Sequence, residues 1–389
     1  MPQARTRNSR AACRKHVLPG MVLAGLALAT FSPAFAADAE RQIDRTLPAQ
    51  SNLTVELHNL AGNVTVAAAS GSEVRVAATV HAAAGSAAEA ERIAGLLKVT
   101  YEQVGDRWVV KAVYPLDESR RYCYPRRAQE ESLPWFLEWL DLGSSNFKYA
   151  DREVHVVSQP GGGALTLYAD FRVELPAGVG VKVRDGIGII DSTGVRGAQN
   201  LDISTGEVQV QDSEGAVAVD TGSGDVRIVR QKGDVQVDTG SGDVHLDKVT
   251  AARIDIDTGS GDIDLQETSG ALNCDTGSGD IIGRGLTFGS SISADTGSGD
   301  VTLSGDFSAV GKIAIDTGSG DVTLEAAPAA AAPQVRMAVS TGSGEITLDL
   351  PSSRITHSSR GDIKAEIGKA TGTADISTGS GDVTLRARR

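Results

Sequence analysis

The chain is poor in aromatic residues, in cysteine and in positive charge. Aromatic residues make up 4% of the 389 residues while glycine reaches 45, a balance compatible with disorder. The apolar residues recur at fixed places, however, which disorder does not require. Three cysteines are too few for a disulfide framework. With 37 basic against 50 acidic residues the surface repels nucleic acid, which is excluded as a partner.

Long apolar runs are also scarce, and the one candidate lies at the N-terminus. Five basic residues and no acid precede an apolar run over 17–30, and Ala34-Phe35-Ala36 supplies a small-residue cleavage site. This pattern predicts a secretory signal peptide over residues 1–36. We therefore expect an exported protein, periplasmic or extracellular at the cell surface, with no integral membrane span after signal cleavage. Its net charge would be −18, and Cys123 and Cys274 would allow one disulfide.

An internal repeat occupies the second half of the chain. T-G-S-G begins at positions 221, 239, 258, 276, 296, 317, 341 and 378, so most copies are 18 to 21 residues apart. The double step before 378 suggests a degenerate copy at His357–Ile363, and Ser204–Val208 is a shorter forerunner. Such a period is the signature of a stacked repeat architecture.

Each repeat places apolar residues at alternate positions on both sides of the turn. Val235 and Val237 precede one turn, and Val244 and Leu246 follow it. A period of two in β-branched residues predicts strands with one buried face. The predicted fold class is therefore all-β, a single-chain β-solenoid with two short strands in each coil of 18–21 residues. Stacked hairpins are the rival geometry, since glycine-rich turns also close antiparallel pairs.

The turn itself carries two columns of acids. D-T-G-S also surrounds the catalytic carboxylate of aspartic proteases, but six copies on a short period cannot form one paired-carboxylate site. The first column, Asp220 to Asp316, gives way to serine in other copies, so we expect turn capping there. The second column is acidic throughout: Glu207, Asp225, Asp243, Asp262, Asp280, Asp300, Asp321, Glu345, Asp362 and Asp382. Calcium held by Asp225, Asp243, Asp262, Asp280, Asp300 and Asp321 is a possible cofactor; simple solvation of an exposed edge is the alternative.

The N-terminal half divides by composition. Ser86 to Glu89 form a capping box, which predicts a short helix over about 86–98 that caps the solenoid. The predicted domains are the signal peptide (1–36), an N-terminal β region with that helix (37–116), a Trp- and Arg-rich insertion (117–150), transition strands (151–200) and the regular TGSGD-repeat solenoid (201–389). The insertion supplies the candidate partner-binding residues Arg126, Arg127, Trp135, Phe136 and Trp139, unless it packs on the solenoid.

The order of these segments resembles a known family. "VELHNLAGNVTV", "SEVRVAATV", the helix "AAEAERIAGLLK", "FRVELPAGVGVKVRDGIGII" and the tandem T-G-S-G-D copies follow one another as in the bacterial putative-adhesin family of β-strand-repeat proteins, a family of unknown function. The resemblance covers most of residues 50–389 apart from the insertion. It implies an exported, non-catalytic β-solenoid and brings no catalytic residues with it.

Three functions are compatible with these observations. The first is an adhesin-like structural or binding module of the bacterial cell envelope, not an enzyme, that meets an unknown envelope or extracellular ligand. The second is a calcium-stabilised extracellular β-roll. The third is a carbohydrate-active β-helix enzyme that uses acids on a solenoid face. Single aspartate changes would abolish activity in the enzyme, whereas a structural column would lose stability by degrees.

Overall fold

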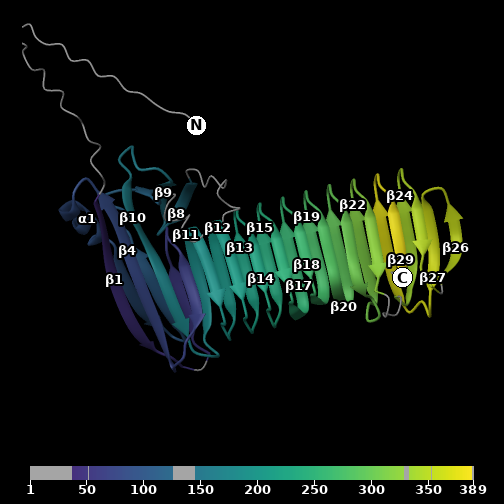
Figure 1. Ribbon diagram of the computed structural model, residues 1–389, viewed down its shortest axis with the longest axis horizontal. Coiled ribbons are helices and arrows are strands. Elements are labelled where there is room, and N and C mark those ends of the chain that lie inside the picture. The colour runs from purple at the N-terminus through teal and green to yellow at the C-terminus, as the bar shows by residue number, and fades with distance from the viewer. Residues whose placement is uncertain (1–36, 51, 126–144, 328–332, 352, 388–389) are drawn as a thin grey trace, which may run out of the picture. The chain divides into compact units, whose positions relative to one another are not determined.

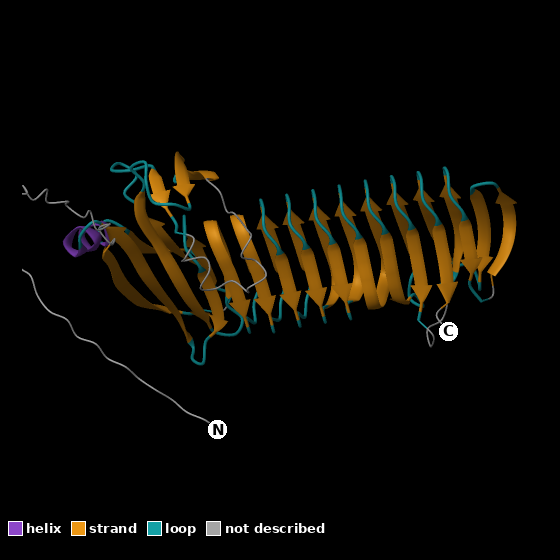
Figure 2. Ribbon diagram, turned by 45° about the horizontal axis from the view of Figure 1, so that its top comes forward, coloured by secondary structure: helices purple, strands orange, loops and turns teal. Residues whose placement is uncertain are grey.

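The computed structural model describes residues 37–50, 52–125, 145–327, 333–351 and 353–387. These residues form an all-β protein with a β-solenoid-like repeat and, among them, a single helix, so the predicted all-β class is confirmed (Figures 1 and 2). Within the same ranges, no helix has the length and apolar character needed to cross a membrane.

Each coil of the repeat contributes one strand before the T-G-S-G turn and one after it. The strands before the turn are β13 (Val217–Thr221), β15 (Val235–Thr239), β17 (Thr250–Thr258), β19 (Ser269–Thr276), β22 (Lys312–Thr317), β24 (Val335–Thr341) and β28 (Gly372–Thr378). The strands after it are β14 (Val226–Val229), β16 (Val244–Asp247), β18 (Ile263–Gln266), β21 (Val301–Asp306), β23 (Val322–Ala326), β25 (Ile346–Asp349) and β29 (Val383–Ala387). The long strands β11 (Gly180–Thr193), β12 (Gln199–Gln211) and β20 (Ile281–Thr296) bend from one row into the other, which makes the hydrogen-bonded sheet continuous.

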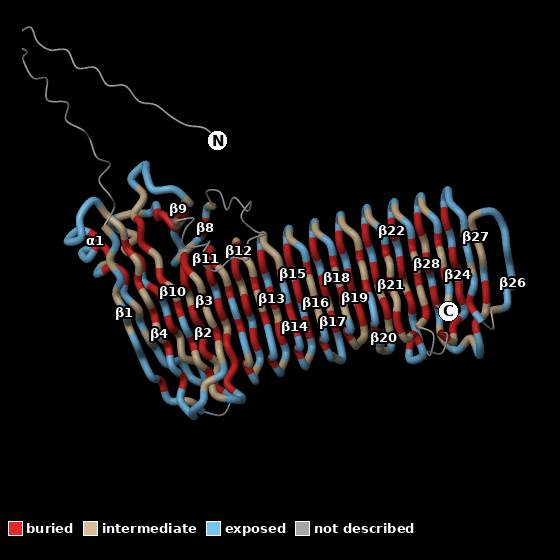
Figure 3. Tube along the Cα trace, in the orientation of Figure 1, coloured by how far each residue is buried: buried red, intermediate tan, exposed pale blue. Residues whose placement is uncertain are grey.

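Equivalent strands of neighbouring coils pair in parallel and in register. Val235 of β15 lies opposite Val217 on one side and Ile254 on the other. Stacked hairpins would require antiparallel neighbours, so that geometry does not describe these coils. The alternate apolar residues point inward along both rows, and Figure 3 shows the resulting regular alternation of buried and exposed positions. The core of the repeat is thus one column of aliphatic side chains stacked on the next.

The T-G-S-G turn keeps a constant length because it stacks on copies of itself. Gly242 has a φ of 148°, and a Cβ there would lie 2.2 Å from the carbonyl oxygen of Gly224 in the preceding coil. The buried Thr258 hydroxyl donates to the Gly242 carbonyl oxygen at 3.3 Å. A side chain at the glycine would push neighbouring coils apart, so the stacking itself demands the motif.

The order of the coils in space departs from their order in the sequence. β22 pairs with β28, and β28 pairs with β24; likewise β23 pairs with β29, and β29 with β25. The last coil of the chain therefore lies between the two coils that precede it in the sequence. Ser377 Oγ donates to Asp316 Oδ1 at 2.6 Å, and Arg386 Nε donates to Glu325 Oε1 at 3.0 Å, across this contact.

The predicted degenerate coil at His357–Ile363 is wrong. These residues lie in an antiparallel hairpin of β26 (Ser353–Ser359) and β27 (Asp362–Ile367), with Arg360 and Gly361 at its tip. β27 pairs antiparallel with β24, next to the last stacked coil. The segment lacks the alternate apolar residues of a coil strand before its turn, and β26 is exposed or half-exposed along its whole length.

At the N-terminal end both rows continue into less regular strands. These are β1 (Ala37–Pro48), β2 (Thr54–His58), β3 (Val64–Ala68), β4 (Glu73–Ala84), β5 (Lys98–Val104), β6 (Arg107–Val113), β7 (Arg121–Cys123), β8 (Ser145–Tyr149), β9 (Arg152–Val157) and β10 (Leu165–Leu175). One row runs β11–β2–β6–β5, and the other β11–β3–β10–β4–β1, with antiparallel pairs at the outer ends. β7, β8 and β9 form a small sheet joined to β10.

The helix α1 (Ala87–Ala94) begins at the predicted cap. Ser86 Oγ accepts a hydrogen bond from the backbone N–H of Glu89 at 3.3 Å, and the helix ends at Gly95, earlier than expected. It packs against β1 and β4. That it closes the end of the solenoid core stays a prediction. Cys123 and Cys274 are both buried free thiols, so the disulfide that the sequence allowed is not formed.

Candidate functional site

The second acidic column forms a hydrogen-bonded ladder between coils. One carboxylate oxygen of Asp243 accepts from the backbone N–H of Asp262 in the next coil at 2.9 Å, and Asp262 accepts from Asp280 at 2.8 Å. The same bond links all the following pairs: Asp225–Asp243, Asp280–Asp300, Asp300–Asp321, Asp321–Asp382 and Asp382–Glu345. Each aspartate therefore binds the next coil, which is a structural role.

The two glutamates of this column lie at the ends of the ladder. Glu207 is bonded to the Gln209 side chain, and Glu345 donates its N–H to Asp382 in the last stacked coil. An aspartate side chain has the length to reach the backbone N–H of the next coil. A glutamate at the end of the ladder does not have to make that bond. The aspartates of this column thus share a hydrogen bond to the next coil in addition to their acidic character. Asp362 belongs to the β26–β27 hairpin and lies outside the ladder.

The first acidic column does not cap the turns as expected. The backbone N–H two residues after Asp238 and Asp257 belongs to Gly240 and Gly259, and each donates to a threonine carbonyl of the preceding coil at 3.0 Å. The carboxylates instead stand exposed and in register, and burial and the neighbouring Asp275 and Asp238 raise the pKa of Asp257. Within the described residues no group of three or more His, Cys, Asp or Glu side chains is placed to hold a metal ion. Calcium at the second column stays a prediction.

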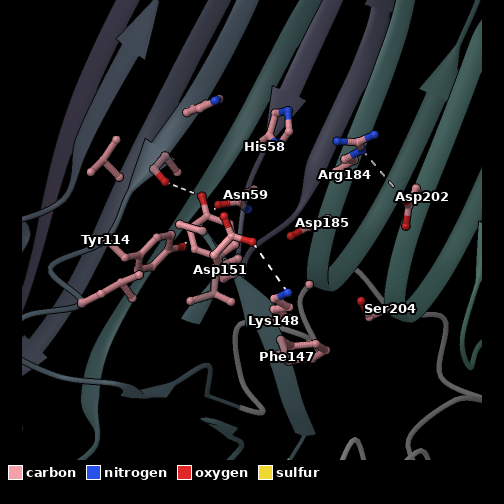
Figure 4. Close-up of a pocket in the computed structure, with 18 residues that line it drawn as sticks. His58, Asn59, Tyr114, Phe147, Lys148, Asp151, Arg184, Asp185, Asp202 and Ser204 are labelled. Carbon is pink, nitrogen blue, oxygen red and sulfur yellow. Dashed lines mark hydrogen bonds and ion pairs between the residues drawn. The ribbon is translucent and has the colours of Figure 1, made fainter. Parts of the chain in front are cut away.

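A polar cavity lies at the N-terminal end, beside Asp185. A cavity of about 560 Å³ opens between the first turns of the solenoid, the end of β6 and the β8–β9 hairpin. Its walls include His58, Asn59, Leu60, Lys111, Tyr114, Leu116, Phe147, Lys148, Tyr149, Asp151, Arg184, Asp185, Asp202 and Ser204, ten of which are labelled in Figure 4. The cavity is lined by segments that are far apart in the sequence.

Asp185 occupies an inward position of β11. It lies opposite Ile203, which in turn lies opposite Thr221, so it stands in the column that buried threonines fill in the repeat. Its side chain is 4% exposed, and among the described residues neither carboxylate oxygen has a hydrogen bond of ordinary geometry. Burial raises its pKa well above the usual range, although the Asn59 amide and the Gly186 backbone N–H oppose the shift. Burial therefore favours the protonated carboxyl, which can donate one hydrogen bond.

The groups around Asp185 are already engaged with the protein. The Tyr114 hydroxyl donates to Asn59 Oδ1 at 3.2 Å and to the Ala61 carbonyl at 3.1 Å. Asn59 Nδ2 donates to the Ala169 carbonyl at 3.0 Å. The Tyr149 hydroxyl donates to the Ala112 carbonyl, and its ring meets that of Tyr114 edge-on. The wall is thus held in place around one unsatisfied carboxyl.

Charged side chains of both signs surround the cavity. Arg184 lies 3.5 Å from Glu56 and 4.0 Å from Asp202, and Lys148 lies 3.7 Å from Asp151. Lys111 is exposed and makes no ion pair within 4 Å with the described residues. Burial lowers the pKa of His58 even though Glu56 opposes the shift, so this imidazole is neutral near pH 7.

The repeat matches the sequence model of a protein family. The model of the Toastrack DUF4097 domain matches residues 200–326 and 305–386. The chain carries a Toastrack DUF4097 domain. The expected kinship with the putative-adhesin family of β-strand-repeat proteins is thereby confirmed. No curated protein matches the chain in sequence.

Solved structures similar to this chain are distant in sequence. A "putative lipid binding protein" from Parabacteroides distasonis has 9% identity and a TM-score of 0.35, with 88% of this chain and 96% of that one covered. A "putative adhesin" from the same organism has 9% identity and a TM-score of 0.34, covering 88% and 97%. A "putative cell adhesion protein" from Clostridium sporogenes has 9% identity and a TM-score of 0.20, covering 91% and 100%.

The candidate residues divide between the Toastrack domain and its surroundings. Asp225, Asp243, Asp262, Asp280, Asp300 and Asp321 all lie in the Toastrack domain and are brought together as the ladder. Arg126, Arg127, Trp135, Phe136 and Trp139 lie outside the described residues. The cavity was missed, although one signal was available. Every second residue of this segment is apolar at Val181, Val183 and Ile187, which predicts an inward-facing series of positions. Asp185 belongs to the same series, so its carboxylate is expected on the inward face.

Proposed function

We propose that the protein is an exported, non-catalytic binding module of the bacterial cell envelope, in which the cavity beside Asp185 takes a ligand and the Toastrack domain is its support. One observation carries this proposal. A cavity of about 560 Å³ contains a buried carboxyl group without a hydrogen bond of ordinary geometry to any described residue. A buried polar group left in that state costs stability, and a bound ligand would satisfy it.

The regular part of the chain supports a scaffolding role. The aspartates of the second column accept a hydrogen bond from the next coil, and from Thr258 onward the turn threonines donate to a glycine carbonyl of a neighbouring coil, so these groups are occupied by the stacking. A stacked repeat of this kind presents whatever is attached to its end on a stiff base. The sequence pattern of residues 1–36 supports export.

The location is tested by proteolysis of intact cells. Cutting of the protein in whole cells would place it on the surface and make adhesion the working hypothesis. Protection in whole cells, lost when the outer membrane is opened, would place it in the periplasm. Protection that persists in spheroplasts, while a periplasmic marker is digested, would refute export.

Ligand binding is tested by thermal unfolding of the full chain against a panel of saccharides, short peptides and fatty acids. We expect one class to raise the melting temperature of the wild type and to lose that effect in Asp185→Leu. Asp349→Leu is the control, because Asp349 ends β25 in the repeat and does not line the cavity. If no class shifts the wild type, the binding role is refuted.

A carbohydrate-active enzyme is the second candidate, favoured by a specific pair of acids. Asp185 and Asp202 both line the cavity, and burial raises the pKa of both. A protonated acid beside a second carboxylate is the arrangement that glycoside hydrolysis uses. Release of reducing ends from polysaccharide by the wild type, absent in both Asp185→Asn and Asp202→Asn, would favour the enzyme over the binding module.

A further inference from the structure

We propose that the ligand of this cavity is a saccharide of one or two rings that bears a carboxylate, with ring hydroxyls bonded to Asp185 and the carboxylate facing Lys111. This inference rests on the proposed binding function, because it names the ligand class of the same cavity. It uses three independent features of the wall: the buried carboxyl, the aromatic surface and the unequal charge of the rim.

The buried carboxyl favours a hydroxyl-bearing ligand. Both oxygens of Asp185 lack a partner of good geometry among the described residues, so the ligand must offer groups that donate and groups that accept. A hydroxyl does both, whichever protonation state Asp185 takes. Asn59 and Tyr114 are bonded to one another and to backbone carbonyls, so they orient the wall. The Asn59 amide and the backbone N–H groups of Gly186 and Ile187 also lie near Asp185 and oppose the rise in its pKa, but none makes a hydrogen bond of ordinary geometry with it.

The aromatic surface favours a ring. Phe147 and Tyr149 come from β8 and line the cavity with Tyr114, and the Tyr114 and Tyr149 rings meet edge-on at a centroid distance of 5.7 Å. Both tyrosine hydroxyls are engaged, which leaves ring surface for contact. The C–H face of a sugar packs on such a surface while its hydroxyls point to polar groups. A cavity of about 560 Å³ lies in the range of small-molecule sites.

The charge of the rim favours an acid over an amine. Arg184 and Lys148 are paired with Asp202 and Asp151, whereas Lys111 has no ion pair within 4 Å among the described residues. A ligand carboxylate would complete this pattern, and a ligand ammonium group would be repelled by Lys111. Lys111 lines the cavity and is exposed, whereas Asp185 is buried.

Calorimetric titration of the full chain with digalacturonate and with neutral galactobiose tests the inference. We expect the wild type to bind digalacturonate at least ten-fold more tightly than galactobiose. Asp185→Leu should weaken both at least ten-fold, and Asp185→Asn, which still donates and accepts, should retain most of the affinity. Lys111→Met should remove the preference for the acid, while Lys312→Met, an exposed lysine in the repeat, should leave it unchanged.

The outcomes separate the ligand class from the binding function. If neither sugar binds but a peptide or a fatty acid binds in an Asp185-dependent way, the saccharide inference is overturned and the binding function stands. Digalacturonate affinity that is the same in Asp185→Leu, Lys111→Met and the wild type would also overturn it. If digalacturonate is bound and hydrolysed, the ligand class is supported and the non-catalytic part of the proposed function fails. If nothing on the panel binds, both fail.

Discussion

The repeat and the N-terminal end treat their carboxylates in opposite ways. In the repeat, one carboxylate oxygen of Asp262 accepts a hydrogen bond from the backbone N–H of Asp280. The backbone N–H of Asp262 in turn donates to the carboxylate of Asp243 in the preceding coil. At the N-terminal end, Asp185 is more deeply buried and has no bond of ordinary geometry among the described residues. The two acids belong to the same stacked architecture, only a few coils apart.

The difference shows what regular stacking supplies. Where the coils are alike, an aspartate of the second column meets a backbone N–H of the next coil at a constant offset, so the same hydrogen bond recurs along the column. At the N-terminal end the rows pass from parallel to antiparallel pairing and a hairpin lies over the turns. The offset is then lost, a cavity opens, and a polar group can remain free for a ligand. Four experiments test this contrast.

The largest effect is expected where the stacking itself is attacked. Gly242→Ala would place a Cβ 2.2 Å from the Gly224 carbonyl oxygen at a φ of 148°. We expect a loss of roughly 3 kcal/mol or more in the free energy of unfolding, measured with urea. Gly71→Ala is the control, because a Cβ there meets nothing within 4 Å. Equal losses in the two variants would contradict the stacked-turn account.

Asp185 should make the protein less stable as pH rises. Its folded-state pKa is raised by burial, so above the unfolded pKa of about 4 the folded state holds one more proton than the unfolded state. Stability from this group is therefore lost with rising pH, at roughly 1.4 kcal/mol per unit until the folded pKa is reached. We expect Asp185→Asn to match the wild type near pH 4 and to become more stable than the wild type as the pH rises above that value. The gap is measured by urea unfolding at each pH, and a gap independent of pH would show that Asp185 is ionised in the folded protein.

A smaller effect should distinguish the two acidic columns within a single coil. Asp262→Ala removes the acceptor for the Asp280 N–H and should cost about 1 kcal/mol at this exposed site. Asp262→Asn keeps an acceptor oxygen and should cost little. Asp257→Ala, five residues earlier, removes a carboxylate that faces like charges and should be neutral or slightly stabilising. Denaturant midpoints of the three variants decide the matter, and a loss in Asp257→Ala as large as in Asp262→Ala would refute the ladder's special role.

The smallest effect is expected from calcium. One oxygen of each aspartate in the second column is already bonded to the next coil, and the described residues contain no cluster of three metal-ligating side chains. Millimolar calcium should therefore leave the melting temperature unchanged, as magnesium at the same ionic strength does. A calcium-specific rise of several degrees would instead support the β-roll alternative.

Much of the repeat was predictable from its sequence, since the information is local and repeated. The alternation of Val235 and Val237 around an invariant turn indicates strands with one buried face, and the capping box at Ser86 starts the helix where expected. The hairpin at 353–367 and the position of the last coil could not be obtained in this way. All T-G-S-G copies are nearly equivalent, so local pattern does not say which coil lies beside which.

The candidate site was less predictable for a related reason. The acids of the second column were found, but their role as hydrogen-bond acceptors depends on the exact offset between coils, which the spacing alone does not show. The alternation of inward and outward side chains along β11 indicates that Asp185 points inward. Only the meeting of β6, β8 and β11 shows that it faces a cavity beside Tyr114 and Phe147.

The strand period, the glycine turn and the all-β class follow from the local sequence, because they depend on side-chain alternation and backbone sterics over a few residues. The tertiary structure decided the order of the terminal coils, the partners of the two acidic columns and the enclosure of Asp185. Those features depend on hydrogen bonds and burial between residues distant in the chain, and their free energies exist only once the coils are stacked.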